Sequence, residues 1–244
     1  MTAHHAPPLK TIGLLGGMSW ESTATYYSLI NRLVNQRLGG LHSARILLSS
    51  VDFAEVALQQ QQNDWAASAA LLREHARKLE TAGAKLIVLC TNTMHKVADE
   101  IAAGIQIPFL HIADALVQAL NADGITRIGL LGTRFTMQQA FYRERLQSKG
   151  IEVLVPDDAQ QDEVHRIIFD ELCAGTFSPA SRQRYLDVID ELSQRGAQAV
   201  ALGCTEIGLL VKPEDTAVPL YDTTTLHASA AVSAALNTER LRTG

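Results

Sequence analysis

The sequence predicts an α/β protein with two similar halves, each built on a parallel sheet that is covered by helices. Short apolar runs alternate with stretches of helical spacing along almost all of the 244 residues, and this alternation is typical of such sheets. The stretch 83–93 also aligns without gaps on the stretch 196–206, and Ile12–Gly16 matches Ile128–Gly132. Repeated strand–turn–helix units in the same order indicate two halves with one topology.

The composition excludes several classes of protein. Hydrophobic residues make up 47% and charged residues 19% of the chain, as in ordinary globular proteins with a large core. The net charge of −5 offers no basic surface for nucleic acid, and no apolar run approaches the roughly 20 residues of a membrane span. We therefore expect neither nucleic acid nor a membrane as a partner. The first residues lack the apolar centre of a signal peptide, and the few cysteines imply no disulfide framework, which favours the reducing cytoplasm.

Helix caps and apolar runs mark the elements of the first half. Ser19 is a suitable N-cap for the helix that follows it, and Gly39-Gly40 is suited to end that helix. Asn63 or Asp64 is expected to cap a second long helix. The expected strands cover residues 11–15, 44–50, 86–90 and 107–112, and the expected helices cover residues 20–38, 53–62, 64–83, 91–103 and 113–121.

The second half begins near Thr126 and repeats this pattern. Ser178 followed by Pro179 is a strong helix start, because proline fits the first helical position. Gly150 and Gly175 are expected to end helices. The expected strands cover residues 126–132, 151–155, 197–202 and 218–222, and the expected helices cover residues 137–149, 162–174, 179–196 and the segment from 226 onwards.

Three candidate sites directly follow strands: Gly16–Ser19, Thr91–Thr93 and Cys204–Glu206. In parallel α/β folds, ligands bind beyond the carboxyl ends of the strands. Two glycines before a helix let the backbone approach a ligand and aim N–H groups at an anion, although the same pair also suits a tight packing turn. Cys204 is expected at a strand-to-helix switch, where backbone N–H groups and the helix dipole favour the thiolate. The alternative is an inert buried thiol.

Other reactive side chains are weaker candidates. His95 follows Thr91 on an expected helix, where a structural role is the simpler interpretation. His111 ends a strand, and its counterparts in the second half are Asp222 and Thr223; each of them could face a ligand or make only local contacts. The histidines lack the spacing of a zinc site, the sequence has no G-x-S-x-G elbow, and no lysine is obviously placed for a Schiff base. We therefore expect neither a metal nor a cofactor.

A thiol and a polar turn at two strand ends are suited to proton chemistry at carbon. A thiolate near its working pKa can remove a proton from carbon. Backbone N–H groups can bind a carboxylate and stabilise its enolate-like form as charge develops. Acid–base groups on opposite faces of one carbon atom would invert it, so these residues indicate a racemase that needs no cofactor.

At these residues the sequence resembles the aspartate/glutamate racemase family, and in particular its branch of L-aspartate/glutamate-specific or broad-specificity amino-acid racemases. The resemblance rests on Gly13–Thr23, Gly39–Ser43, Leu89–Lys96 and Gly203–Val211. It implies two α/β subdomains related by a pseudo-twofold axis, with the substrate between them, no cofactor, and a homodimer. The first subdomain would comprise residues 10–116 and a returning C-terminal helix, 226–240, and the second would comprise residues 117–225.

The resemblance also implies roles for individual residues. Cys204 matches the second catalytic cysteine of the family, whereas Thr91 takes the place of the first, as it does in the branch named above, and would serve the opposite face of the substrate. Cys90 is one residue too early, and its side chain should point elsewhere along the strand. The expected substrate-binding residues are Met18, Ser19, Gln60, Asn92, Thr93, Thr205 and Glu206. In the second half, His165 and Arg166 are the nearest candidates for a basic group that binds a substrate carboxylate.

Two other interpretations stay open. Relatives on the same scaffold include hydantoin racemases, maleate isomerases and arylmalonate decarboxylases, which can also use a cysteine at this kind of turn. The missing first thiol also fits a non-catalytic amino-acid-binding module. An assay panel of amino acids, hydantoins, maleate and arylmalonates would separate the enzymes, and ligand binding without solvent exchange at the α-carbon would identify the binding module.

Overall fold

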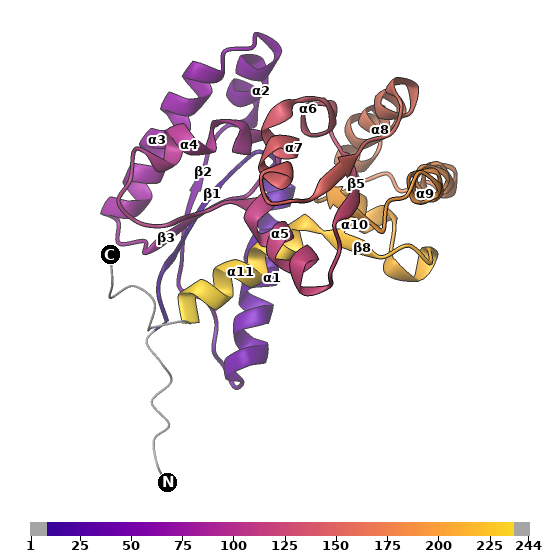
Figure 1. Cartoon of the computed structure of the whole chain (residues 1–244). Helices are drawn as coiled ribbons and strands as arrows, with labels where there is room; N and C mark the ends of the chain where they lie inside the picture. The colour runs from indigo at the N-terminus through magenta and orange to yellow at the C-terminus, as the bar shows by residue number, and fades with distance from the viewer. Residues whose placement is uncertain (1–8, 237–244) are drawn as a thin grey trace. The chain divides into compact units, whose positions relative to one another are not determined.

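The computed structural model describes residues 9–236 and divides into two compact units (Figure 1). Unit 1 comprises the chain up to His111 together with the segment from His227 onwards, and unit 2 comprises Ile112–Leu226. The first division falls before the expected boundary at residue 116, because the whole of helix α5 (Ile112–Ala122) packs its apolar side into the core of unit 2. The N-terminal tail and the end of the expected helix 226–240 lie outside the described residues.

Unit 1 is built on a parallel sheet with the strand order β2-β1-β3-β4. Its strands are β1 (Ile12–Gly16), β2 (Ile46–Ser50), β3 (Leu86–Leu89) and β4 (Phe109–Leu110). Its helices are α1 (Trp20–Leu38), α2 (Phe53–Gln61), α3 (Trp65–Thr81), the 3-10 helix η1 (Thr93–Val97), α4 (Ala98–Ala102) and α11 (Thr223–Leu236), which belongs to unit 1 from His227.

Helices cover both faces of this sheet. Because successive strand side chains point to opposite faces, Leu15 and Leu89 pack with α3 and α4, whereas Leu14 and Val88 pack with α1 and α11. Figure 1 shows α3 and α4 on one side of β1 and β3, and α1 and α11 on the other. Burying each large aliphatic side chain contributes about 1.5–3 kcal/mol, so the two layers hold the sheet and the positions of its strand ends.

Unit 2 repeats this architecture, with the parallel strand order β6-β5-β7-β8. Its strands are β5 (Arg127–Gly132), β6 (Glu152–Leu154), β7 (Ala199–Gly203) and β8 (Leu220–Asp222). Its helices after α5 are α6 (Arg134–Gln138), α7 (Ala140–Gln147), α8 (Asp158–Asp170), η2 (Leu172–Ala174), α9 (Pro179–Gln194), α10 (Ile207–Leu210) and η3 (Pro213–Asp215). Helices α8 and α9 pack on one face of the sheet, and α5 and α7 pack on the other.

The common strand order confirms the prediction of two similar parallel-sheet units. β1 and β5 contain the matched runs Ile12–Gly16 and Ile128–Gly132, and β3 and β7 are the strands that precede Thr91 and Cys204. Thr91 and Cys204 therefore occupy the same topological position, each in its own unit.

Helix η1 departs from the prediction of one continuous helix over residues 91–103. The Nδ1 atom of His95 lies 2.8 Å from the Thr91 carbonyl oxygen, which is the acceptor that the backbone N–H of residue 95 would use in an α-helix. That N–H donates instead to the Asn92 carbonyl at 3.1 Å and so closes a 3-10 turn. The His95 side chain thus occupies the carbonyl that its own backbone N–H would bond in an α-helix. The hydrophobic periodicity of the sequence does not report this exchange of hydrogen-bond partners.

Local capping explains several helix starts. Ser19, Asp64 and Ser178 cap α1, α3 and α9 as expected. Helix α8 begins earlier than predicted because Asp157 and Gln160 form a capping box, in which each side chain accepts from the other residue's backbone N–H. The start of a helix thus follows from its cap more closely than from the first apolar residue.

Some elements are shorter than expected. The helix predicted over 137–149 is split into α6 and α7 by extended backbone at Gln139. The strand predicted over 107–112 reduces to β4, because only Phe109 and Leu110 pair with β3. In the part of the chain that the structure describes, no helix combines the length and the apolar character needed to cross a membrane.

Candidate active site

Each sheet has a topological switch point at the carboxyl ends of two neighbouring strands. In unit 1, β1 lies between β2 and β3, and in unit 2, β5 lies between β6 and β7 in the same way. From the two neighbouring strands at such a point, the chain continues toward opposite edges of the sheet. α/β proteins bind ligands beyond the strand ends at these points. The segments located there are Gly17–Ser19 and Thr91–Thr93 in unit 1, and Thr133–Arg134 and Cys204–Glu206 in unit 2. Each set of predicted residues therefore lies at the switch point of its own unit.

Thr23 fixes the loop after β1. Its hydroxyl oxygen accepts the Gly17 N–H at 2.8 Å, and its hydroxyl donates to the Ser19 carbonyl at 2.8 Å. Gly17 has a φ of 93°, and a Cβ atom there would clash with the Val51 carbonyl oxygen, so only glycine fits. Met18 is 4% exposed and packs in the core, so a substrate contact at Met18 would come from its backbone.

Cys90 and Thr91 have different surroundings at the end of β3. Cys90 is fully buried among apolar side chains of α1 and α11, and this burial raises the pKa of its thiol far above the ordinary value. Cys90 is therefore a core residue, and its side chain points elsewhere than that of Thr91, as strand alternation predicts. Thr91 is partly exposed at the switch point. The Ser22 hydroxyl donates to the Cys90 carbonyl at 3.0 Å and ties α1 to this strand end.

The other predicted residues of unit 1 gather at the same turn. Asn92 is 6% exposed and Thr93 is 9% exposed. The Nε2 atom of Gln60 donates to the Met94 sulfur at 2.9 Å, so the side chain of Gln60 reaches η1 from α2. Asn92 and Thr93 thus directly follow Thr91, and the Gln60 amide contacts the same turn at Met94.

In unit 2 the Cys204 thiol is hydrogen-bonded to a carboxylate. Gly132 and Gly203 pair in register at the ends of β5 and β7, and Cys204 follows directly. The Sγ atom of Cys204 donates to Oε2 of Glu206 at 2.9 Å. Glu206 is 9% exposed, and Cys204 is partly buried against the apolar core that contains Tyr185. The resemblance assigns Glu206 to the substrate, but in the structure its carboxylate contacts the thiol.

The expectation that this turn favours the thiolate holds only for its backbone: burial and the Glu206 side chain outweigh the Glu206 backbone hydrogen bond, which lowers the pKa of Cys204. Helix α10 begins only at Ile207 and comprises a single turn, so little helix dipole acts on Cys204. Burial raises the pKa of the Cys204 thiol well above its ordinary value, and the charge and the hydrogen bond of Glu206 raise it further. Burial and the Glu206 carboxylate therefore favour the protonated thiol at this turn.

The remaining strand-end candidates of unit 2 make local contacts. The Thr223 hydroxyl donates to the carbonyl of Leu202, near the end of β7, at 2.8 Å. Asp222 accepts the Thr224 N–H at 3.0 Å, at the start of α11. Thr205 is partly exposed beside Cys204. Of these residues, Thr205 is the one whose position suits contact with a ligand at the switch point.

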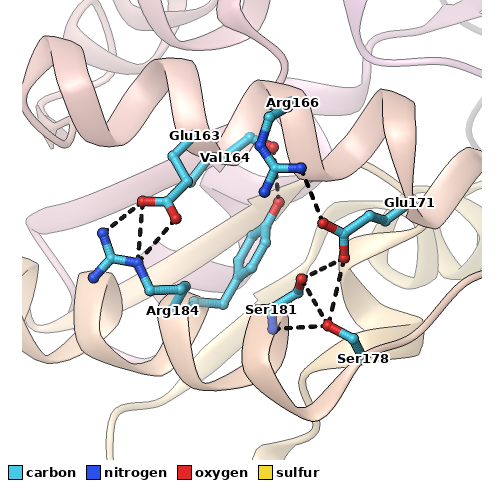
Figure 2. A network of polar contacts seen from close by, with 8 residues as sticks. Glu163, Val164, Arg166, Glu171, Ser178, Ser181 and Arg184 are labelled. Atoms are coloured by element: carbon cyan, nitrogen blue, oxygen red, sulfur yellow. Dashed lines mark hydrogen bonds and ion pairs between the residues drawn. The ribbon is translucent and has the colours of Figure 1, made fainter.

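The basic side chains of unit 2 have separate roles. Arg166 pairs with Glu171 at 3.1 Å, in the polar network between α8 and α9 that Figure 2 shows. The Nδ1 atom of His165 accepts the backbone N–H of Arg134 at 3.2 Å. Arg134 itself lies at the β5 switch point, and its half-exposed guanidinium pairs with Asp162 at 2.7 Å. Sequence reasoning missed Arg134, although its position just after the second Leu-Leu-Gly run could have identified it.

Proton transfer and carboxylate binding are within the chemical reach of these side chains. Unit 2 offers a thiol with a carboxylate acceptor, and unit 1 offers a hydroxyl with amide and hydroxyl neighbours. No disulfide joins the three cysteines. Between residues 9 and 236, no group of three or more His, Cys, Asp or Glu side chains is placed to hold a metal ion.

Comparison with known proteins places these features in a family. Residues 15–231 match the family described as Asp/Glu/Hydantoin racemase. The broad specificity amino-acid racemase RacX of Bacillus subtilis (strain 168) is 26% identical over 232 residues, which are 91% of this chain and 96% of that protein.

Two crystal structures are similar along nearly their whole length. A proposed Asp/Glu racemase from Yersinia pestis is 54% identical, and the alignment covers 94% of this chain and 100% of that chain with a TM-score of 0.90. An aspartate racemase homologue from Pyrococcus horikoshii OT3 is 31% identical over 94% of this chain and 100% of that chain, with a TM-score of 0.84. Because the family match includes both sheets, the chain belongs to the Asp/Glu/hydantoin racemase family and is an isomerase of the racemase type.

Proposed function

We propose that the chain is a cofactor-independent amino-acid racemase that acts on aspartate and glutamate, with Cys204 and Thr91 on opposite faces of the substrate α-carbon. The observation that carries the proposal is the strand–turn device that occurs twice. It ends in a thiol bonded to a carboxylate in unit 2 and in a partly exposed hydroxyl in unit 1. The names of the similar proteins, a broad specificity amino-acid racemase and an aspartate racemase homologue, support this substrate class.

The first proton transfer takes place within unit 2. The Cys204 thiol passes its proton to the Glu206 carboxylate, which already accepts its hydrogen bond, and the thiolate then removes the α-proton of the substrate. The raised pKa of the thiol keeps the proton in place before substrate arrives, and the ammonium group of a bound amino acid favours the thiolate. Negative charge then develops on the substrate α-carboxylate, where backbone N–H groups can stabilise it.

Unit 1 supplies the opposite face in this proposal. The Thr91 hydroxyl donates a proton to the carbanion, solvent returns a proton to the threonine oxygen, and the Glu206 carboxyl releases to solvent the proton that it took from Cys204, so every group returns to its starting state. A hydroxyl is a far weaker acid and base than a thiol at neutral pH, so this step limits inversion. The residues proposed to bind the substrate are Met18, Ser19, Gln60, Asn92 and Thr93 from unit 1 and Thr205 from unit 2.

Two unequal faces predict unequal proton exchange. L and D enantiomers have equal free energy in water, so kcat/KM must be the same for the two directions of racemisation. The rate of α-proton exchange with solvent at the Cys204 face, in contrast, can differ between the two enantiomers. With one enantiomer, expected to be L, the α-proton should therefore exchange with D2O about tenfold or more faster than the substrate inverts.

NMR of L- and D-aspartate and of L- and D-glutamate in D2O, without added cofactor, measures exchange, and chiral chromatography measures inversion. Excess exchange from one enantiomer alone supports the proposal. Equal exchange and inversion from both enantiomers contradicts the assignment of the two faces. Binding without any exchange would identify a binding module, and turnover of hydantoins, maleate or arylmalonates alone would identify one of the related enzymes.

Replacing Glu206 with glutamine should slow α-proton exchange about tenfold to a hundredfold, because an amide accepts the thiol hydrogen bond but cannot take up the proton. The same change removes a negative charge that raises the pKa of the Cys204 thiol, so alkylation of Cys204 by iodoacetamide should begin at lower pH. Slower exchange together with easier ionisation identifies Glu206 as the proton acceptor. A higher KM with an unchanged kcat would assign Glu206 to substrate binding instead.

The resemblance to racemases also leads us to propose a homodimer in the cytoplasm. Sedimentation equilibrium at assay concentrations measures the mass of the assembly, and a monomer with full activity would contradict this part of the proposal.

A further inference from the structure

Three buried histidines meet beside the Thr91 turn in unit 1. His95 is 3% exposed, His111 is 8% exposed and His227 is 0% exposed. The ring centre of His95 lies 4.6 Å from that of His111 and 5.7 Å from that of His227. The three rings come from η1, from the segment after β4 and from α11. The cluster therefore joins the Thr91 turn to the edge strand and to the last helix of unit 1.

His227 anchors the cluster to its surroundings. Its Nε2 atom lies 2.8 Å from the Leu110 carbonyl oxygen, and its Nδ1 atom lies 2.9 Å from the Tyr26 hydroxyl. Because a carbonyl only accepts, Nε2 carries the proton, and in the neutral ring Nδ1 accepts from Tyr26. The chain also passes between the units directly after His111 and directly before His227. Both connections between the units therefore start at this cluster.

His95 contacts the turn itself. Its Nδ1 atom donates to the Thr91 carbonyl at 2.8 Å, since that carbonyl can only accept. Burial lowers the pKa of His95 well below its usual range, and the neighbouring His111 and His227 lower it further. Backbone hydrogen bonds with Thr91 and Asn92 raise this pKa but do not outweigh the burial. The ring is thus neutral at neutral pH, with its proton on the nitrogen that faces Thr91.

We propose that His95 is a positioning residue for Thr91, whose hydroxyl is aimed by the bond between His95 Nδ1–H and the Thr91 carbonyl. The inference rests on the proposed function, in which Thr91 serves one face of the α-carbon. A hydrogen bond that fixes the Thr91 carbonyl also fixes the backbone of Thr91, and this backbone sets the direction of the hydroxyl side chain. The histidine cluster keeps the His95 ring in place. Losing this bond should therefore lower inversion, the step that Thr91 performs, more than α-proton exchange at the Cys204 face.

Two substitutions separate the hydrogen bond from the bulk of the ring. His95→Leu removes the donor, whereas His95→Asn places an amide N–H close to the position of Nδ1. In D2O, His95→Leu should lower the ratio of inversion to α-proton exchange about tenfold, because small misplacements of a reacting group are costly. His95→Asn should keep a ratio near that of the wild type.

Tyr26→Phe is the matched control. It removes a hydroxyl that bonds His227 on the far side of the cluster and leaves the bond between His95 and Thr91 in place. It should leave the ratio of inversion to exchange unchanged, even where it lowers the melting temperature. A lower ratio in Tyr26→Phe as well would show that cluster stability, and not the His95 bond, controls inversion, and would overturn the inference.

Amide hydrogen exchange supplies a readout that does not depend on activity. Amides of residues 91–97 should exchange about tenfold or more faster in His95→Leu than in the wild type or in His95→Asn. Unchanged amide exchange overturns the inference, and so does a loosened turn with an unchanged ratio of inversion to α-proton exchange. Failure of the proposed function looks different: the wild type itself then shows equal α-proton exchange and inversion from both enantiomers, and amide exchange alone decides whether His95 holds the turn.

Discussion

Serine or alanine in place of Cys204 should abolish racemisation and α-proton exchange together. The thiol is the base that the proposed mechanism uses on one face, and a positioned acid–base group contributes about 10²–10⁴-fold to a rate. Both rates should therefore fall by at least about a hundredfold. Serine can keep a hydrogen bond to Glu206, as the thiol does, but its hydroxyl is too weak a base at neutral pH. NMR in D2O and chiral chromatography on the same samples measure the two losses.

Cys173→Ser is the matched control for these variants. Cys173 is exposed and lies on η2, outside the Cys204–Glu206 turn and with no part in the proposed proton transfers. Its replacement should change both rates by less than about twofold, as is usual for a surface substitution. Thermal denaturation checks that each variant is folded. Near-normal exchange in a folded Cys204→Ser protein would show that Cys204 is not the base and would remove the main support of the proposed function.

Sequence periodicity located the two strand ends because a buried parallel strand is apolar on both faces. Leu86–Leu89 and Ala199–Gly203 are fully buried runs that end at polar turns. Aligning these runs without gaps placed Thr91 and Cys204 at equivalent positions, and the common strand order confirms that equivalence. Strand alternation likewise predicted that the Cys90 side chain points elsewhere than that of Thr91, and Cys90 lies in the core between α1 and α11. These features depend on local pattern, which the sequence carries directly.

Contacts that depend on the bend of a turn could not be predicted in this way. The bond between Glu206 and Cys204 forms because the chain turns back within two residues, and no periodicity reports that turn. The short α10 also changed the electrostatics, since a longer helix would have favoured the thiolate at Cys204, whereas burial and Glu206 oppose it. The histidine cluster joins residues 95, 111 and 227, and only the return of α11 to unit 1 brings them together.

Replacing Thr91 with cysteine should raise the racemisation rate on the order of tenfold or more, because a thiol exchanges protons far more readily than a hydroxyl near neutral pH. Thr91 is partly exposed, so a thiol there avoids the burial that raises the pKa of the Cys90 thiol. The gain must appear equally in both directions, since the enantiomers have equal free energy. Exchange at the Cys204 face should change little, so the ratio of inversion to exchange should rise toward one.

Thr91→Val is the matched control, because valine keeps the shape of threonine and lacks the hydroxyl. It should lose inversion by about a hundredfold, while the Cys204 face continues to exchange the α-proton of one enantiomer. Chiral chromatography and NMR in D2O give the two rates for Thr91→Cys, Thr91→Val and the wild type side by side. Wild-type racemisation in Thr91→Val would mean that water or another group serves that face. An unchanged rate in Thr91→Cys, with inversion lost in Thr91→Val, would mean that the hydroxyl acts but that proton transfer there does not limit turnover.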